Sequence, residues 1–297
     1  MATAFCPAHI TGFFKAELDK EDSKQLGSLG AGFSIQKGVK TTVTIRNKTK
    51  HDISNFTIKV NGFESGNMRV SEVVLNKFST KGKFVDIIHE IDVPVGYGFG
   101  SSAAVALSLS IALNDALECK LSKIKVAQIA HDVEIECKTG LGDVLASYYG
   151  GFEIRDKPGA PGIGHVQKIT LNKISIIMIC FSPISTSKFI KERLPRINGL
   201  GGKMVNKLLE SKNYEHFQEM SLEFAKYVDV MTPRMQKVVN ELSKNNIKCG
   251  IALFGETIFS MIPKENENKI LKILEKYSDG IIIKSELDDT GARVLYN

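Results

Sequence analysis

The sequence predicts an α+β protein built from two domains. Its 297 residues are enough for two domains of ordinary size and for burial of most of the apolar surface. Stretches of β-branched residues and stretches with helical periodicity follow one another in mixed order, as in α+β folds. A glycine-rich loop joins a predicted strand directly to a predicted apolar helix, and this junction is the most informative feature of the chain.

The first half of the chain is expected to supply strands and then helices. Alternating β-branched residues predict strands at residues 41–45, 56–60 and 87–93. The third strand runs into the glycine-rich loop, and the alanine- and leucine-rich run over residues 103–113 predicts a helix directly after it. A strand, a loop and a helix therefore follow one another without a break.

A second helix is predicted over residues 123–138. Ser122 is a suitable N-cap, apolar positions recur at helical spacing, and the two glycines within residues 139–142 end the helix. A third, short helix is expected to start near Asp143, and residues 150–155 have the composition of a strand.

The two domains are expected to meet near Gly164. Residues 157–164 contain two prolines and three glycines, which is typical of a linker. We therefore assign residues 1–164 to an N-terminal domain and residues 165–297 to a C-terminal domain.

The second half also mixes strands with helices, as expected for an α+β domain. We expect a strand at 174–181, a helical block at 185–244 interrupted at Pro195 and Pro233, strands within 251–262, a helix at 265–277 and a strand at 280–284.

Composition argues against several classes of protein. The net charge is +6 and the pI is near 8.9, but no run of five or six like charges occurs, so no nucleic-acid partner is expected. The five cysteines are scattered and never spaced as C-x-x-C, which argues against a disulfide framework or a zinc ribbon and suits a reducing cytoplasm. The N-terminus lacks the pattern of a secretory signal, and the apolar runs are too short to span a bilayer. We therefore expect a cytoplasmic protein without a membrane anchor.

The glycine-rich loop has the sequence PVGYGFGSSAA over residues 94–104. Gly96, Gly98 and Gly100 alternate, so the backbone can bend until several N–H groups point one way, and the following helix adds its N-terminal N–H groups and dipole. The loop therefore predicts a polyphosphate site that includes Ser101 and Ser102. The lack of a following lysine excludes a Walker P-loop, and the G-x-G-x-G spacing excludes the dinucleotide fingerprint. The structural alternative is a turn in which Ser101 or Ser102 only caps the helix.

The same loop resembles the P-x-x-x-G-[LF]-G-S-S-A-A motif of the GHMP kinases, the superfamily of galactokinase, homoserine kinase and mevalonate kinase. The resemblance implies a two-domain GHMP kinase fold, with a ribosomal protein S5 domain 2-like N-terminal domain and a ferredoxin-like α/β layer C-terminal domain. It also implies ATP-dependent phosphorylation of a small-molecule hydroxyl, with Mg2+ on the phosphates.

Phosphoryl transfer needs a metal ion on the phosphates and an oriented acceptor hydroxyl. Ser102 and Glu134 are the expected Mg2+ ligands, because hard cations take hydroxyl and carboxylate oxygens. Glu134 lies about one turn after His131 on the same face of its predicted helix. The alternatives are a half-buried His131 beside a solvated Glu134, and Glu136 as a rival ligand that helical geometry points elsewhere.

Asp143 follows the tight turn formed by residues 139–142, so its carboxylate is expected at a helix N-terminus that keeps it ionised. An N-cap role is the alternative. GHMP kinases with an identified base carry an aspartate in this region, shortly after a metal-binding glutamate. By that resemblance Asp143 is the catalytic residue that takes or orients the proton of the acceptor hydroxyl.

A narrower resemblance, to the archaeal pantoate kinase family, covers nearly the whole chain. It is carried by AFCPAHITGFF at 4–14, GSLGAG at 27–32, TGLGDV at 139–144, the glycine pair 150–151 and GIALFGET at 250–257. The last segment departs from the glycine-rich third motif of the wider superfamily. This resemblance implies phosphorylation of the terminal hydroxyl of (R)-pantoate by ATP and Mg2+ in coenzyme A biosynthesis, and a homodimer.

A monocarboxylate acceptor such as pantoate must be gripped by the protein. Arg155 can donate two parallel hydrogen bonds to a carboxylate, while Ser28 and His131 can supply hydrogen bonds near the reacting centre. The alternatives are a surface arginine, a serine favoured by a glycine-rich turn, and a core histidine.

His9 and Thr11 belong to the first motif of the resemblance and are expected to shape the acceptor pocket. Ala8 stands where the family usually has glycine, so the approach of the backbone at this point is expected to differ slightly.

Two other functions stay open on sequence alone. One is a GHMP kinase for homoserine, mevalonate or a sugar, against which residue Arg155 and residues 27–32 argue by resemblance. The other is a non-catalytic ATP-binding regulatory protein, against which the joint presence of Ser102, Glu134 and Asp143 argues.

Overall fold

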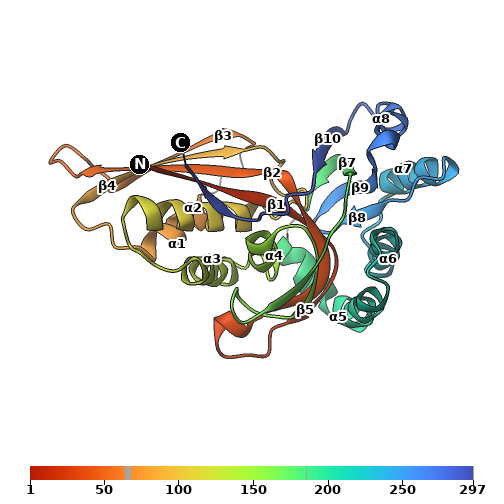
Figure 1. Ribbon diagram of the computed structural model, residues 1–297, viewed down its shortest axis with the longest axis horizontal. Coiled ribbons are helices and arrows are strands. Elements are labelled where there is room, and N and C mark those ends of the chain that lie inside the picture. Colours follow the sequence, from red (N-terminus) through yellow and green to blue (C-terminus); the bar gives the residue numbers. More distant parts are fainter. Residues whose placement is uncertain (64–67, 185, 297) are drawn as a thin grey trace.

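Two β-sheets organise the chain in the computed structural model, which describes residues 1–63, 68–184 and 186–296 (Figure 1). The first sheet has the strand order β11-β1-β2-β4-β3, with β5 pairing to β2 and β6 to β5. Its strands are β1 (Ala2–Glu17), β2 (Gly27–Asn47), β3 (Phe56–Gly62), β4 (Lys83–Ile91), β5 (Phe152–Lys157), β6 (His165–Ile169) and β11 (Arg293–Leu295).

Strands β1 and β2 form a long antiparallel pair at the centre of this sheet. The pair is joined through the short 3-10 helix η1 (Ser23–Gln25). The end of β2 pairs with β4 from Val39 to Asn47, whereas its beginning pairs with β5 from Gly30 to Phe33. Because β2 pairs with β4 and β5 as well as with β1, it links the strand before the glycine-rich loop to the strand that carries Arg155.

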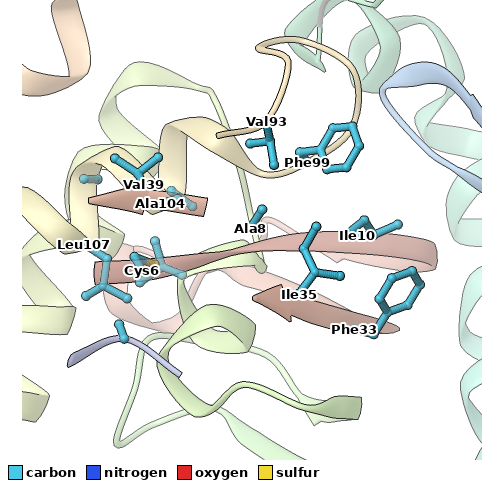
Figure 2. Close-up of a cluster of buried hydrophobic side chains, with 14 of the residues drawn as sticks. Cys6, Ala8, Ile10, Phe33, Ile35, Val39, Val93, Phe99, Ala104 and Leu107 are labelled. Atoms are coloured by element: carbon cyan, nitrogen blue, oxygen red, sulfur yellow. The ribbon is translucent and has the colours of Figure 1, made fainter. Parts of the chain in front are cut away.

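Four helices of the first half are α1 (Arg69–Asn76), α2 (Ser101–Ala116), α3 (Lys123–Cys137) and α4 (Asp143–Tyr149). Helix α2 is buried on nearly every side, since it packs on β1 and β2 and is flanked by α1 and α3. Figure 2 shows Val93 and Phe99, at the two ends of the glycine-rich loop, pointing toward the buried Ala8, Ile10 and Ile35. These apolar contacts attach the loop to the core.

The second sheet has the strand order β10-β7-β9-β8 and is covered by the later helices (Figure 1). These elements are β7 (Ile174–Pro183), α5 (Thr186–Ser211), α6 (Tyr214–Tyr227), α7 (Pro233–Lys244), β8 (Gly250–Ala252), β9 (Gly255–Pro263), the 3-10 helix η2 (Lys264–Asn266), α8 (Glu267–Leu274) and β10 (Ile281–Glu286). Helices α5 and α6 also pack on β1, which joins the core of the second half to that of the first.

The α+β fold class and most predicted elements are confirmed, but the interruption expected at Pro195 is wrong. Pro195 lies inside α5, which continues to Ser211, and the chain turns at Lys212, where φ is +47°. Proline removes one helical hydrogen bond, and the packing of α5 on β1 and β2 compensates for that loss. Pro233 is the first residue of α7, a position where proline fits a helix. Ser185, at the expected start of the helical block, lies outside the described residues.

Several elements were not predicted. The strand expected at residues 41–45 covers only the later part of β2, because the glycines of residues 27–32 conceal the strand pattern at its beginning. Strand β1 was also not predicted. Helix α1 and the short, partly exposed strands β6 and β11 also carry weak local signals.

The chain crosses from the first sheet to the second after β6 and returns before β11, which pairs with β1. Residues 158–164 connect β5 to β6 within the first sheet. A division between the sheets falls after Ile169 rather than at Gly164, and the two-domain assignment itself stays a prediction. Among the described residues, none of the helices has the length and apolar character needed to cross a bilayer.

Candidate active site

The glycine-rich loop lies between β4 and α2 and curls through backbone conformations that favour glycine. Gly96, Gly98 and Gly100 have φ values of +86°, +87° and +56°, all in the left-handed region. This explains why glycine alternates with other residues here.

The N-terminus of α2 is open toward a cavity. Gly100 is the N-cap and no side chain caps the helix, so the capping role considered for Ser101 and Ser102 is wrong. The first N–H groups of a helix have no partner within it, and together with the helix dipole they favour an anion. A cavity of about 370 Å3 lies against this helix end, lined by the loop, by Arg69 and by the segment after α3.

The second half of the chain holds the loop in place. The N–H of Ile184 donates to the carbonyl oxygen of Gly96 at 2.9 Å, and the hydroxyl of Thr257 donates to that of Tyr97 at 2.8 Å. A Cβ at Gly98 would lie 2.4 Å from the carbonyl oxygen of Leu253, so only glycine fits. The cavity therefore forms where the two sheets meet.

Ser102 and Glu134 come together beside this cavity, as predicted from the sequence. The Ser102 hydroxyl donates to Oε2 of Glu134 at 3.2 Å, and the Thr139 hydroxyl donates to Oε1 at 2.5 Å. Burial, reinforced by the negative charge of Asp143, raises the pKa of Glu134 to about 7. Glu136 is exposed on the same helix and pairs with Lys77, so it points away from the site.

The donor set around Glu134 fits Mg2+. A Cβ built on Gly140 would lie 2.3 Å from Oε2 of Glu134 and 3.3 Å from Oδ2 of Asp143, so both carboxylates border one small space. A cation there would relieve their repulsion and find a hydroxyl and a carboxylate oxygen. Within the described residues no cluster of three or more His, Cys, Asp or Glu side chains could hold a metal.

Asp143 is the first residue of α4 and its side chain is 14% exposed. Gly142 is the N-cap, so the capping role considered for Asp143 is wrong. Its Oδ1 atom lies 2.8 Å from Nδ1 of His9 and accepts from the Thr11 hydroxyl at 3.4 Å. Burial raises the pKa of Asp143, but the hydrogen bond and charge of His9 outweigh that effect and hold the pKa below its ordinary value. Asp143 is therefore an ionised carboxylate that lines the cavity.

Behind Asp143 lies a buried group of charges that sequence reasoning found only in part. His9 and Thr11 were expected near the acceptor, and both contact Asp143. Glu153 was missed, although it alternates with Arg155 on one face of β5. Arg155 donates to Oε1 of Glu153 at 2.5 Å.

Ser28 and Arg155 lie side by side, whereas His131 is separate. A Cβ at Gly142 would be 2.4 Å from Oγ of Ser28 and 2.9 Å from Nε of Arg155, and that Nε has no hydrogen-bond partner. Arg155 is 0% exposed and lies behind the wall of the site. His131 lies 3.1 Å from the carbonyl oxygen of Ser23 and supports the segment that leads to Ser28.

A small hollow beside Asp143 combines polar and apolar walls. Ser28 and Thr11 supply hydroxyl groups, and apolar surface comes from Phe14, Leu141, Ile190 and Phe254. Leu141 and Ile190 also line a larger apolar groove of about 890 Å3 between α5 and the end of α3. The hollow has only about 10 Å3 of free space and shares Gly140, Leu141 and Ile190 with the groove, so the two adjoin beside Asp143.

Two further residues that line the cavity were not predicted from the sequence. Arg69, on the unpredicted helix α1, and Lys138, the left-handed C-cap of α3, both line the cavity at the glycine-rich loop. Their positive charges favour a phosphate-bearing ligand.

Comparisons with known proteins agree with this geometry. The family model described as GHMP kinases N terminal domain matches residues 68–151. Pantoate kinase of Methanocaldococcus jannaschii is 34% identical over 91% of this chain and 96% of its own, and pantoate kinase of Thermococcus kodakarensis is 29% identical over 91% of each chain. A solved structure described as a phosphotransferase related to the CoA biosynthesis pathway has a TM-score of 0.87 at 28% identity, covering 98% of this chain and 97% of its own.

Proposed function

The chain belongs to the pantoate kinase family of the GHMP kinases, and on that basis we propose that it phosphorylates the terminal hydroxyl of (R)-pantoate with ATP. The products are (R)-4-phosphopantoate and ADP, and the reaction is a step of coenzyme A biosynthesis.

One observation carries this proposal: an uncapped helix N-terminus and an ionised Asp143 border the same cavity. The loop from Gly96 to Ser102 would bind the ATP phosphates through backbone N–H groups. Arg69 and Lys138 line the same space and would add positive charge. Phosphoryl transfer depends mainly on such positioning and charge stabilisation.

Asp143 would act on the acceptor through Oδ2. Oδ1 is already engaged by His9 and Thr11, whereas no hydrogen bond from a described residue reaches Oδ2. In the reaction the acceptor oxygen forms a bond to the γ-phosphorus, the bond between that phosphorus and the β–γ bridging oxygen breaks, and ADP leaves. The hydroxyl proton passes to Oδ2.

Mg2+ would be held by Ser102 and Glu134 together with phosphate oxygens. When bound, it neutralises charge on the phosphates. The buried, closely spaced carboxylates of Glu134 and Asp143 support this assignment.

Pantoate carries two methyl groups on the carbon next to the reacting CH2OH, and its carboxylate lies at the other end of the molecule. The hollow beside Asp143 has only about 10 Å3 of free space, room for about one water molecule, so the acceptor would lie in the adjoining groove of about 890 Å3 and reach Asp143 through a widened hollow. Phe14, Ile190 and Phe254 offer apolar surface to the methyl groups. Ser28 would donate to the acceptor, and the unpartnered Nε of Arg155 would meet the carboxylate after a small shift of the Gly142 segment.

Three further assignments complete the proposal. His131 stays a proposed substrate residue that would act through the segment from Ser23 to Ser28. A hollow of about 200 Å3 lined by Val60, Met68 and Val70 continues from the phosphate cavity and would accept the adenine. A cytoplasmic homodimer is proposed from the family resemblance.

The decisive experiment measures ADP release by the purified protein with MgATP and (R)-pantoate. Homoserine, mevalonate, galactose and a reaction without acceptor run beside it. Release with pantoate alone supports the proposal. Release with another acceptor keeps the kinase but overturns the substrate, and no release from protein that binds MgATP favours the non-catalytic alternative.

A further inference from the structure

Glu153 is a charged residue that is fully buried in β5. Buried charges are costly unless they are paired. Its Oε1 accepts from Nη1 of Arg155 at 2.5 Å and lies 2.9 Å from Nε2 of His9, while Oε2 has no hydrogen-bond partner. Glu153 therefore connects an arginine to a histidine inside the protein.

His9 lies between two carboxylates. Its Nδ1 is 2.8 Å from Oδ1 of Asp143, and its Nε2 is 2.9 Å from Oε1 of Glu153. Carboxylates accept hydrogen bonds, and a neutral imidazole carries only one N–H, so the doubly protonated ring is the form that donates to both carboxylates. Nη1 of Arg155 also lies 3.4 Å from Nε2 of His9, and its positive charge acts against that form. Burial lowers the pKa of His9, but its bonds to Asp143 and Glu153 outweigh that effect and raise the pKa above its ordinary value.

The strands leave room for this chain of charges. Gly32 of β2 pairs with Thr11 on one side and with Glu153 on the other. A Cβ at Gly32 would lie 2.5 Å from Nε2 of His9. Glycine at this position therefore allows the imidazole to reach Glu153 across β2.

The charges in the chain balance. Asp143 and Glu153 are negative, while His9 and Arg155 are positive. Neutralising Glu153 would leave His9 without the partner that favours its second proton. Asp143 would then lose the cation that keeps it ionised.

We propose that Glu153 is a positioning residue for phosphoryl transfer: acting through His9, it holds Oδ1 of Asp143 engaged and Oδ2 directed at the acceptor. The inference deepens the proposed function and rests on it. Arg155 thereby has a role besides contact with the acceptor, because its guanidinium anchors Glu153.

The first test is Glu153→Gln, which keeps the size of the side chain and an oxygen for Arg155 but removes the charge. We expect kcat to fall by roughly 10- to 100-fold, as for other residues that orient a catalytic group, with MgATP affinity unchanged. The acid limb of the pH profile of kcat should move to higher pH. The charged groups facing His9 are Asp143 from α4 and Glu153 and Arg155 from β5; loss of the Glu153 charge deprotonates His9 and so raises the pKa of Asp143.

Glu256→Gln is the matched control. Glu256 is also a largely buried carboxylate bonded to an arginine, Arg234, but it lies in the second sheet. This variant should keep the wild-type acid limb. An unshifted acid limb with normal kcat in Glu153→Gln, or a parallel loss of MgATP affinity, would overturn the positioning role.

A second measurement does not depend on activity or on the folding of a variant. Nitrogen NMR of the wild-type protein over a pH titration should show that the His9 ring loses its second proton at a higher pH than a free imidazole, and loss at the ordinary pH or below it would contradict the inference. If wild-type protein releases no ADP with pantoate, the proposed function fails, whereas the protonation of His9 is still decided by NMR.

Discussion

The hydroxyl of Ser102 on α2 donates a hydrogen bond of 3.2 Å to the buried carboxylate of Glu134 on α3. The contact fixes the spacing between the helix that faces the phosphates and the helix that supplies the carboxylate. Both oxygens lie near the cavity at the glycine-rich loop, and in the proposed function the pair would share one cation.

The first prediction concerns this pair. Glu134→Gln should raise the Mg2+ concentration for half-maximal rate by about tenfold or more, because an amide oxygen is a much weaker ligand for a hard cation. The measurement is ADP release against Mg2+ at fixed ATP. Glu136→Gln, an exposed change on the same helix, should leave the Mg2+ curve in place. Equal Mg2+ requirements in the two variants would remove Glu134 from the metal site.

Asp143→Asn should lower kcat by about 10²- to 10⁴-fold, the usual contribution of a general base. The amide fills the same space, so MgATP affinity should stay within about threefold, a limit far smaller than the expected loss of turnover. Turnover and nucleotide binding by calorimetry are measured on the same preparation. Exposed Asp115→Asn, on α2, is the control. If nucleotide binding disappears together with turnover, Asp143 has a structural role.

The variant Gly98→Ala tests the two reasons for a glycine in the loop, which are its backbone conformation and the lack of space for a side chain. At Gly98 φ is +87° and a Cβ would lie 2.4 Å from the carbonyl oxygen of Leu253, whereas at Gly82 φ is +75° and nothing lies within 4 Å. Each alanine should cost about 1 kcal/mol of folding free energy for its backbone conformation. Gly98→Ala should cost more than Gly82→Ala and should also weaken MgATP binding. Thermal unfolding and nucleotide titration provide the comparison, and equal effects of the two alanines would show that the contact with Leu253 is unimportant.

Local signals were sufficient to predict the glycine-rich loop and the helix that follows it. The alternating glycines, the hydroxyl pair and the apolar helix are consecutive in sequence, and the conformation of the loop follows from those residues. The proximity of Glu134 and Asp143 could also be predicted, because α3, its glycine-containing end and α4 are neighbours along the chain.

The charge chain behind Asp143 could not be predicted in the same way. His9 and Glu153 are 144 residues apart and meet only because β2 aligns β1 with β5 in one register. A shift of one residue would turn Glu153 to the other face of the sheet. Burial of Arg155 depends on the same register, which explains why sequence reasoning assigned it to the substrate alone.

Buried His89 should make a contribution to stability that is lost on acidification. Burial lowers the pKa of His89 to about 4, and its ring contacts the hydroxyls of Thr41 and Ser71. The folded pKa lies below the unfolded one, so the contribution to stability is complete above pH 6.5 and is lost as the pH falls toward 4. Roughly 2 kcal/mol of the His89 contribution should disappear between pH 7 and pH 5. Glu134 acts in the opposite direction, because burial raises its pKa to about 7 and its contribution to stability grows as the pH falls. The contribution of His89 is therefore read from the difference between variant and wild type.

His89→Gln tests this contribution. Urea unfolding of the variant should show a smaller loss of stability between pH 7 and pH 5 than the wild type. Some dependence should persist, because burial also lowers the pKa of His131. Exposed His216→Gln should retain the wild-type dependence. A His89→Gln protein with the full wild-type dependence would assign the effect to other groups.

Phe254 should set the preference for an acceptor with two methyl groups. It occupies the turn between β8 and β9 at φ +68°, an unusual conformation for an aromatic residue, and its ring packs against Phe14 and Phe189 with centroid separations of 5.6 and 5.1 Å. In this position it lines both the phosphate cavity and the hollow beside Asp143. Such backbone strain persists where the surrounding packing enforces it, often at a functional site.

The test compares (R)-pantoate with 2,4-dihydroxybutanoate, which lacks both methyl groups but keeps the carboxylate and the reacting hydroxyl. Wild-type kcat/KM should favour pantoate by at least about tenfold, since one methyl group in an apolar pocket is worth roughly that factor. Phe254→Ala should lower kcat/KM for pantoate while changing that for the smaller acceptor much less, so the ratio falls. Because the ratio compares two acceptors on one enzyme, a general loss of folded protein cancels from it. An unchanged ratio would place the methyl groups elsewhere, with the apolar groove at Leu141 and Ile190 as the next candidate.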